Sequence, residues 1–208
     1  MLGTRGLYAI VDPDACRGRD PERVAEAILA GGCAVMQLRT KGLPDLPRLG
    51  LAYRIAARAR AAGVPFVIND RPDLALLVRA DGLHLGQDDL PIAEARRIVG
   101  PMVIGRSTHD PVQAQQAIDE GADVVAFGPV FSTTSKERPD PVVGLEQLAE
   151  VCRECGPPVV AIGGITLDRA PAIARAGARW GAVIGALCGA DDPEAAARAL
   201  HAALGGAG

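Results

Sequence analysis

The chain has 208 residues, of which 49% are hydrophobic and 23% charged, a composition typical of a globular domain with a sizeable core. Aromatic residues make up only 3% and the net charge is −3, which argues against a basic, aromatic-lined groove for nucleic acid. Charges, Gly or Pro interrupt every apolar run before it reaches membrane-spanning length. We therefore expect one domain over residues 1–208, with neither nucleic acid nor a membrane as a partner.

Two features of the sequence favour a cytoplasmic location. The first five residues lack the apolar core of a signal peptide. The five cysteines are an odd, scattered set, which fits reduced thiols. Cys152 and Cys155 form a lone CxxC without a second pair or a nearby His, so we expect no zinc or redox role for them. A homodimer is compatible with the sequence, which does not indicate an oligomeric state.

Short apolar runs recur along the whole chain, separated by longer amphipathic stretches. Near-continuous apolar runs are typical of buried parallel strands. The eight candidate strands are residues 7–11, 34–38, 66–68, 82–85, 102–104, 124–127, 159–162 and 181–184.

Helix signals fill the intervals between these runs. Asp20, Asp110 and Asp192 each precede a Pro, the pattern of an N-cap followed by the first helical residue. Glycines stand where the periodic patterns stop and predict C-terminal caps at Gly31, Gly63, Gly121 and Gly177. Alternation of strands and helices predicts a parallel sheet with right-handed crossovers, either a closed (β/α)8 TIM barrel or an open doubly wound sheet. We expect the barrel, since no GxGxxG follows the first strand.

Polar residues follow nearly every candidate strand, and in a closed barrel these positions meet at the carboxyl-end mouth, where such enzymes place their chemistry. Single residues have simpler interpretations: Asn69 and Asp70 could cap a helix, and His84 could be a hydrogen-bonded core residue. Their shared position favours a functional site. The polar residues are Gln37, Arg39, Lys41, Asn69, Asp70, His84, Gln87, Asp88, Asp89, Ser107, His109 and those of segment 128–136.

The charges among them predict a diphosphate site with a metal ion. Three cations, Arg39, Lys41 and Lys136, follow strands and would lie at one mouth of the barrel, in a chain whose net charge is negative. Such a cluster suits a diphosphate. Asp70 and Asp89 come from neighbouring strands and would repel each other without a cation. Mg²⁺ commonly binds through one or two carboxylates together with substrate phosphate oxygens.

A second phosphate site is indicated after the last strands. Gly163, Gly164 and Gly185 follow the seventh and eighth runs, where many barrels hold a phosphate on backbone N–H groups. The hydroxyls of Thr133 and Ser135 could add donors. The residues thus predict a ligand set with two phosphate-bearing parts, one of them bound to a metal.

Six phrases in this order resemble the thiamine phosphate synthase family. The resemblance extends over about residues 8–199, and although no single phrase is specific, the ordered set is. The phrases are MQLRTK at 36–41, VIND at 67–70, HLGQDDL at 84–90, GRSTH at 105–109, GPVFSTTSK at 128–136 and AIGGIT at 161–166.

The resemblance implies a transferase that joins 4-amino-2-methyl-5-hydroxymethylpyrimidine diphosphate to a thiazole phosphate. It also implies that the bond to pyrophosphate breaks first and that the thiazole nitrogen captures the resulting pyrimidinylmethyl cation. The task of the protein would then be to stabilise the leaving group and exclude water.

The resemblance also implies roles for individual residues. Asp70 and Asp89 would hold one Mg²⁺, and Gln37 would lie on the pyrimidine side. Catalytic contacts to the leaving diphosphate would come from Arg39, Lys41, Ser107 and Lys136, with Asn69 as a further ligand. The thiazole phosphate would be held by Thr133, Ser135, Gly164, Ile184 and Gly185.

Three features differ from the family pattern or lack a role. Ser135 stands where Thr is more usual, which keeps the hydroxyl. Gly185 stands where Ser is frequent, so that a phosphate there would depend on backbone donors. Arg71, beside the metal carboxylate, has no role that the sequence indicates.

We also expect the polar segment 132–140 to close over substrate.

Two alternatives remain at this point. A thiazole tautomerase of the same barrel family would need no metal and would use His109 as its base. Asp89 argues against it, because a tautomerase has no reason to keep a second metal carboxylate. A catalytically silent phosphate-binding barrel would explain the glycines but not the cations and carboxylates together.

Overall fold

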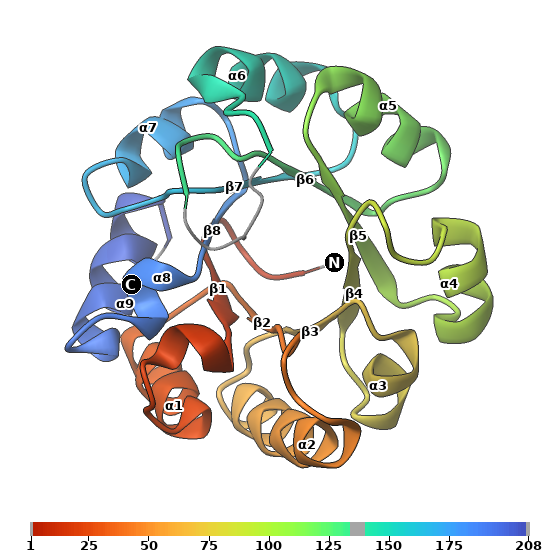
Figure 1. Ribbon diagram of the computed structural model, residues 1–208. Helices are drawn as coiled ribbons and strands as arrows, with labels where there is room; N and C mark the ends of the chain where they lie inside the picture. Colours follow the sequence, from red (N-terminus) through yellow and green to blue (C-terminus); the bar gives the residue numbers. More distant parts are fainter. Residues whose placement is uncertain (1, 134–139, 207–208) are drawn as a thin grey trace.

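A computed structural model describes residues 2–133 and 140–206 and shows a closed eight-stranded parallel barrel. Neighbouring strands follow the chain order, and β1 pairs with β8 to close the ring, with Tyr8 opposite Ala182. Figure 1 shows the strands around a central axis with the helices outside them. The predicted TIM barrel is confirmed, and the open doubly wound sheet is not observed.

The strands agree closely with the apolar runs, with one notable difference. The fifth strand continues past the predicted end at residue 104 to Thr108, because Arg106 and Thr108 are buried although polar. The strands are β1 (Gly6–Val11), β2 (Val35–Leu38), β3 (Phe66–Asn69), β4 (Gly82–Leu85), β5 (Val103–Thr108), β6 (Val124–Phe127), β7 (Val159–Ile162) and β8 (Trp180–Val183).

Helices follow each strand, and three of them begin at the predicted capping aspartates. The side chains of Asp20, Asp110 and Asp192 each accept a hydrogen bond from a backbone N–H of the first helical turn. The predicted cap at Gly31 is wrong by one residue: Gly31 ends its helix, and Gly32 takes the positive φ of 96°. The helices are the 3-10 helix η1 (Pro13–Cys16) and α1 (Pro21–Gly31), α2 (Asp45–Ala61), α3 (Pro72–Leu77), α4 (Ile92–Val99), α5 (Pro111–Asp119), α6 (Gly144–Glu154), α7 (Ala170–Arg175), α8 (Gly185–Cys188) and α9 (Pro193–Ala203).

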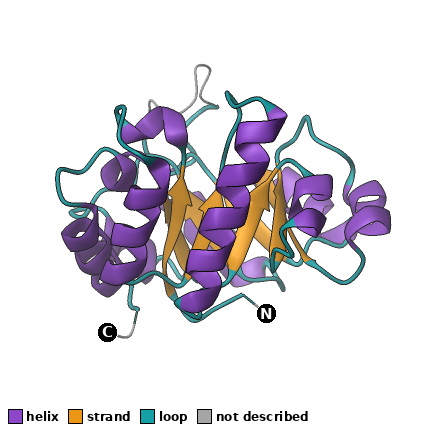
Figure 2. Cartoon of the chain, turned by 90° about the horizontal axis from the view of Figure 1, so that it is seen from below, coloured by secondary structure: helices purple, strands orange, loops and turns teal. Residues whose placement is uncertain are grey.

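The core has two parts, because successive strand residues point to opposite faces. On β1, Leu7 and Ala9 pack against the helices, whereas Tyr8 and Ile10 belong to a second cluster with Trp180. This second cluster fills the barrel interior. Figure 2 shows the strands enclosed by helices, with both chain ends away from the carboxyl ends of the strands. The polar residues that follow the strands therefore share the other, open end.

Within the described ranges, no helix has both the length and the apolar character needed to cross a membrane.

Candidate active site

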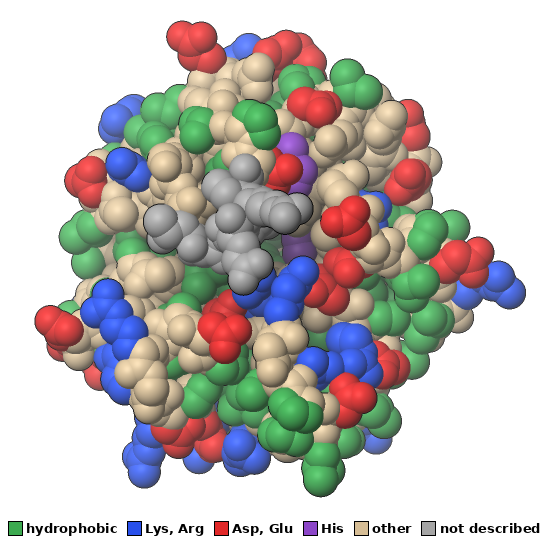
Figure 3. Space-filling model, viewed as in Figure 1, with side chains coloured by type: hydrophobic (Ala, Val, Ile, Leu, Met, Phe, Trp, Pro, Cys, Tyr) green, Lys and Arg blue, Asp and Glu red, His purple; other side chains and the backbone are tan. Residues whose placement is uncertain are grey.

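Basic and acidic side chains lie side by side near the centre of the barrel mouth (Figure 3). Two of the cations come from the segment after β2. Arg39 donates a hydrogen bond from Nη1 to Asp12 Oδ2, and the Nζ atom of Lys41 lies 3.4 Å from Asp70 Oδ2. Asp12 follows β1 and is 4% exposed, so Arg39 is anchored by a buried carboxylate. The ends of β1, β2 and β3 thus bring two ion pairs to one edge of the mouth.

Asp70 and Asp89 are brought together at the ends of β3 and β4. Asp70 has a positive φ of 66°, and its backbone N–H donates to the carbonyl of His84 at 2.8 Å. The Oδ2 atom of Asp89 accepts from the backbone N–H of Gly86 at 2.6 Å. Burial, followed by the hydrogen bond and charge of Asp89, raises the pKa of Asp70 to about 6, against the opposite influence of Lys41. The carboxylates of Asp70 and Asp89 are therefore in contact with each other at the mouth of the barrel.

Such a carboxylate pair suits a hard divalent cation, which would remove the repulsion between the two charges. Among residues 2–133 and 140–206, no group of three or more His, Cys, Asp or Glu side chains is placed to hold a metal ion. The pair would thus supply only part of a coordination shell. Water and substrate oxygens would have to complete it, as is common for Mg²⁺.

Gln37 and Asn69 form a polar ladder that reaches into the barrel interior. The hydroxyl of Tyr8 donates to Gln37 Oε1 at 2.8 Å, and Gln37 Nε2 donates to Asn69 Oδ1 at 3.0 Å. Tyr8 and Gln37 are both buried. The ladder fixes the orientation of the Asn69 amide at the floor of the mouth.

Ser107 lies on β5 beside His84 of β4. His84 Nε2 and Ser107 Oγ are 2.8 Å apart, and Gln87 Nε2 donates to the carbonyl of Ser107. The buried guanidinium of Arg106 donates to the carbonyls of Leu90 and Gln87, both at 3.2 Å. Arg106 thereby holds the loop after β4 that carries Asp89.

His109, the base of the alternative tautomerase, is held at both ring nitrogens. Its Nδ1 atom lies 2.6 Å from the carbonyl oxygen of Gly128, which can only accept, so Nδ1 carries a proton. Its Nε2 atom lies 3.3 Å from Asp140 Oδ2. The ring therefore links β5 to the two ends of the segment that follows β6.

The glycine turn after β7 lies directly against the segment after β6. Gly163 and Gly164 have φ values of 100° and 63°, and the backbone N–H of Phe131 donates to the carbonyl of Gly163 at 3.1 Å. A Cβ atom on Gly164 would lie 2.3 Å from the carbonyl oxygen of Ser132. This contact places Thr133, the next residue, beside the turn.

Ile184 and Gly185 open the short helix α8 after β8, at the same end of the barrel. A Cβ atom on Gly185 would meet nothing within 4 Å, so this position is open. The predicted site residues Ser135 and Lys136, and most of the predicted closing loop, lie outside the described residues.

The structure adds residues to the site that were not predicted. Asp12 anchors Arg39, Tyr8 orients Gln37, and Arg169 donates from Nη1 to the carbonyl of Gly164 at 2.7 Å, with its guanidinium 4.8 Å from the centre of the Phe131 ring. The position of Asp12 directly after the first strand could have identified it as a site residue. Arg169 had no such signal in the sequence, because its contacts depend on how two loops meet.

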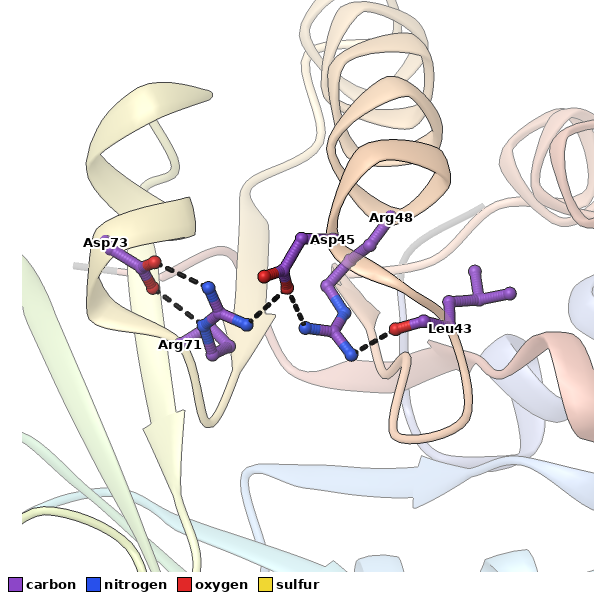
Figure 4. A network of polar contacts seen from close by, with 5 residues as sticks. All are labelled: Leu43, Asp45, Arg48, Arg71 and Asp73. Atoms are coloured by element: carbon purple, nitrogen blue, oxygen red, sulfur yellow. Dashed lines mark hydrogen bonds and ion pairs between the residues drawn. The ribbon is translucent and has the colours of Figure 1, made fainter.

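Arg71, which had no predicted role, lies in a network of ion pairs beside the site (Figure 4). Its guanidinium binds both carboxylate oxygens of Asp73 and also Asp45 at the start of α2. The hydrogen bond from Arg71 lowers the pKa of Asp73.

Cys152 and Cys155, the lone CxxC pair, carry free thiols. Burial raises the pKa of Cys152 to about 11 and also raises the pKa of Cys155. Both would be almost entirely protonated at neutral pH.

An eight-stranded β/α barrel with charged side chains gathered at the carboxyl ends of its strands defines the class of this protein, a TIM-barrel enzyme. The chain belongs to the thiamine monophosphate synthase family, whose sequence pattern it matches over residues 7–187. This finding confirms the family resemblance inferred from the six phrases.

Similar proteins agree with this assignment. A thiamine-phosphate synthase of Anaeromyxobacter dehalogenans is 50% identical over 96% of this chain and 87% of its own length. One of Thermus thermophilus is 49% identical over 99% of both chains. The solved structure of a thiamine phosphate pyrophosphorylase from Pyrococcus furiosus has a TM-score of 0.88 and 33% identity, covering 96% of this chain and 95% of its own.

Proposed function

We propose that this chain makes thiamine phosphate by joining a pyrimidine diphosphate to a thiazole phosphate, with release of pyrophosphate. The observation that carries the proposal is the meeting of Asp70, Asp89 and Lys41 at the mouth, in a chain whose relatives are named thiamine-phosphate synthases. A carboxylate pair beside a cation suits a metal-bound diphosphate better than a single neutral ligand.

The departing pyrophosphate is the charged group that the residues must stabilise. Lys41 and Arg39 would approach its oxygens from the segment after β2, with Lys136 as a third cation. Asn69 and Ser107 would donate hydrogen bonds to it from β3 and β5. Mg²⁺ held by Asp70 and Asp89 would neutralise part of the diphosphate charge. Asn69 is oriented by Gln37 and Ser107 by His84, so donation from these two groups to the leaving group would require little reorganisation.

The thiazole phosphate would bind at the opposite side of the mouth, after β6, β7 and β8. Gly164 and Gly185 present backbone there without a side chain, which allows a phosphate to approach closely. Thr133, Ser135 and Ile184 would complete this subsite. Two phosphate subsites on one rim would hold the thiazole nitrogen close to the pyrimidine methylene carbon, an arrangement that favours capture of the cation over capture of water.

The tautomerase alternative has less support. The Asp70–Asp89 pair has no use in a metal-free proton transfer, and both ring nitrogens of His109 are engaged by Gly128 and Asp140.

The cell location and the assembly are also parts of this proposal. Reduced thiols fit a cytoplasmic enzyme. We expect a homodimer, which size-exclusion chromatography with light scattering can check.

The test is pyrophosphate release on mixing both substrates with Mg²⁺. Wild-type protein should release pyrophosphate only when both substrates and the metal are present. Asp89→Asn should lower the rate by roughly 100-fold, because it removes one of the two metal carboxylates.

Asp88→Asn is the matched control, since Asp88 is the exposed neighbour of Asp89 and has no role in the proposed site. It should retain the wild-type rate. If the wild type releases no pyrophosphate but isomerises the thiazole, and His109→Ala abolishes that isomerisation, the chain is a tautomerase and the proposed metal site is wrong.

A further inference from the structure

Arg71 directly follows the proposed metal carboxylate Asp70, yet its side chain is turned to other partners. Its Nε and Nη2 atoms donate to the two oxygens of Asp73 at 2.9 and 2.6 Å, and Nη1 donates to Asp45 Oδ1 at 2.8 Å. All three nitrogens are therefore engaged by carboxylates. Figure 4 shows the guanidinium lying between Asp73 and Asp45, which come from different β/α units.

The contacts continue from Asp45 into the segment that carries Lys41. Asp45 Oδ1 also accepts from Arg48 Nη1 at 2.7 Å, and Arg48 Nη2 donates to the backbone carbonyl of Leu43. Leu43 is two residues from Lys41. A continuous chain of hydrogen bonds thus joins the turn after β3 to the loop 39–44 after β2.

The two helices that these contacts join have no side-chain caps at their N-cap positions. The N-cap position of α2 is Pro44 and that of α3 is Arg71, and neither makes a side-chain capping hydrogen bond. Side-chain caps normally fix the entry of a loop into a helix. Here Asp45 and Asp73, in the first turns of the two helices, are instead tied to each other through Arg71.

The charges show that the network is not an additional diphosphate site. Arg48 and Arg71 are matched by Asp45 and Asp73, so the cluster is neutral as a whole. An arginine held in two-point contact with one carboxylate and in contact with a second has few donors left for a ligand. The ammonium of Lys41, on the same loop, lies outside this network: it is 56% exposed and 3.4 Å from Asp70 Oδ2.

We propose that Arg71 is a positioning residue, which fixes the loop carrying Lys41 against the turn carrying Asp70 so that both groups face the same diphosphate. This inference rests on the proposed function. Lys41 has a long, flexible side chain, and its reach is set by where the loop backbone is held. The two ion pairs of Arg71 contribute little to overall stability, because Arg71, Asp45 and Asp73 are 38%, 77% and 56% exposed.

The experiment measures pyrophosphate binding by calorimetry with Mg²⁺ present, for wild type, Arg71→Gln, Arg71→Lys and Asp45→Asn. Each variant should bind pyrophosphate about tenfold more weakly, with a melting temperature within about 2 °C of wild type. Arg71→Lys should not restore binding, since an ammonium cannot span two carboxylates as the guanidinium does. Arg97→Gln is the control, because Arg97 pairs with Glu94 on the exposed face of α4. This variant should bind pyrophosphate as tightly as wild type.

Two further measurements separate positioning from direct contact or a general structural role. In a Lys41→Gln background, Arg71→Gln should cause little additional loss, because both changes remove the same interaction. In turnover assays, Arg71→Gln should raise KM for the pyrimidine diphosphate and leave KM for the thiazole phosphate unchanged.

Several results would overturn the inference. They are wild-type affinity in Arg71→Gln, full recovery in Arg71→Lys, additive losses with Lys41→Gln, or an equal rise in both KM values. If wild-type protein binds no pyrophosphate at all and releases none, the proposed function itself fails, and the positioning role fails with it.

Discussion

At the scale of single residues, the buried carboxylate of Asp12 has two different partners. Its Oδ2 atom accepts from Arg39, and its Oδ1 atom accepts from the backbone N–H of Asp14 at 3.1 Å, which caps η1. A carboxylate that is 4% exposed is costly unless it is paired in this way. Asp12 therefore serves both the fold at the end of β1 and the orientation of a proposed diphosphate ligand.

Replacing Asp12 by Ala should lower the free energy of unfolding by about 3 kcal/mol, because it leaves Arg39 unpaired and η1 uncapped. Urea denaturation measures this change. Asp14→Ala, at the exposed neighbouring carboxylate, should stay within about 0.5 kcal/mol of wild type. Equal losses in the two variants would show that the buried pair is not what stabilises this corner of the barrel.

At the scale of elements, the proposed thiazole phosphate subsite depends on two loops that touch through their backbones. The turn at Gly163 and Gly164 packs against Phe131 and Ser132, and Arg169 at the start of α7 holds the carbonyl of Gly164. At Gly164 the positive φ of 63° and the adjacent Ser132 carbonyl both disfavour any side chain. The close approach of the loops thus requires glycine.

Gly164→Ala should therefore separate the two loops. We expect a destabilisation of about 1–3 kcal/mol and a rise of roughly tenfold in KM for the thiazole phosphate, with KM for the pyrimidine diphosphate little changed. Steady-state kinetics with each substrate varied in turn measures the difference. Gly156→Ala is the comparison, since a Cβ atom there meets nothing within 4 Å and its φ is not positive. If KM for the thiazole phosphate is unchanged in Gly164→Ala, this turn does not hold the phosphate.

At the scale of the whole molecule, closure of the barrel joins the beginning and the end of the chain. β1 pairs with β8, α1 packs against α9, and the Nε1 atom of Trp180 donates to the carbonyl of Thr4 at 2.6 Å. Trp180 is the only tryptophan and is fully buried in the barrel interior. Its fluorescence therefore reports on closure of the ring.

We expect residues 1–208 to unfold as a single domain, because removing either end opens the ring and exposes its interior. Unfolding in urea should give the same midpoint by Trp180 fluorescence and by helical circular dichroism. Two separated midpoints would instead indicate two folding units within the barrel. This measurement also tests the predicted domain organisation.

The barrel and most of its elements could be predicted from the sequence, because apolar runs, capping aspartates and terminal glycines are local signals. The fifth strand was predicted too short, since its last residues are polar and are buried only by their neighbours in the barrel. The proposed ligands Arg39, Lys41, Asp70 and Asp89 could be named for a similar reason: each follows a strand, and parallel strands in a barrel end at one mouth.

The sequence by itself therefore determined the class of fold, the end of the barrel that carries the chemistry and the kinds of side chain gathered there. Only the tertiary structure decided which of those side chains meet. The pairing of Arg39 with Asp12, the contact of Asp70 with Asp89 and the bridge from Arg71 to Asp45 join residues of different β/α units. Such contacts depend on strand register and loop path, which are set by packing around the closed ring and not by local sequence pattern.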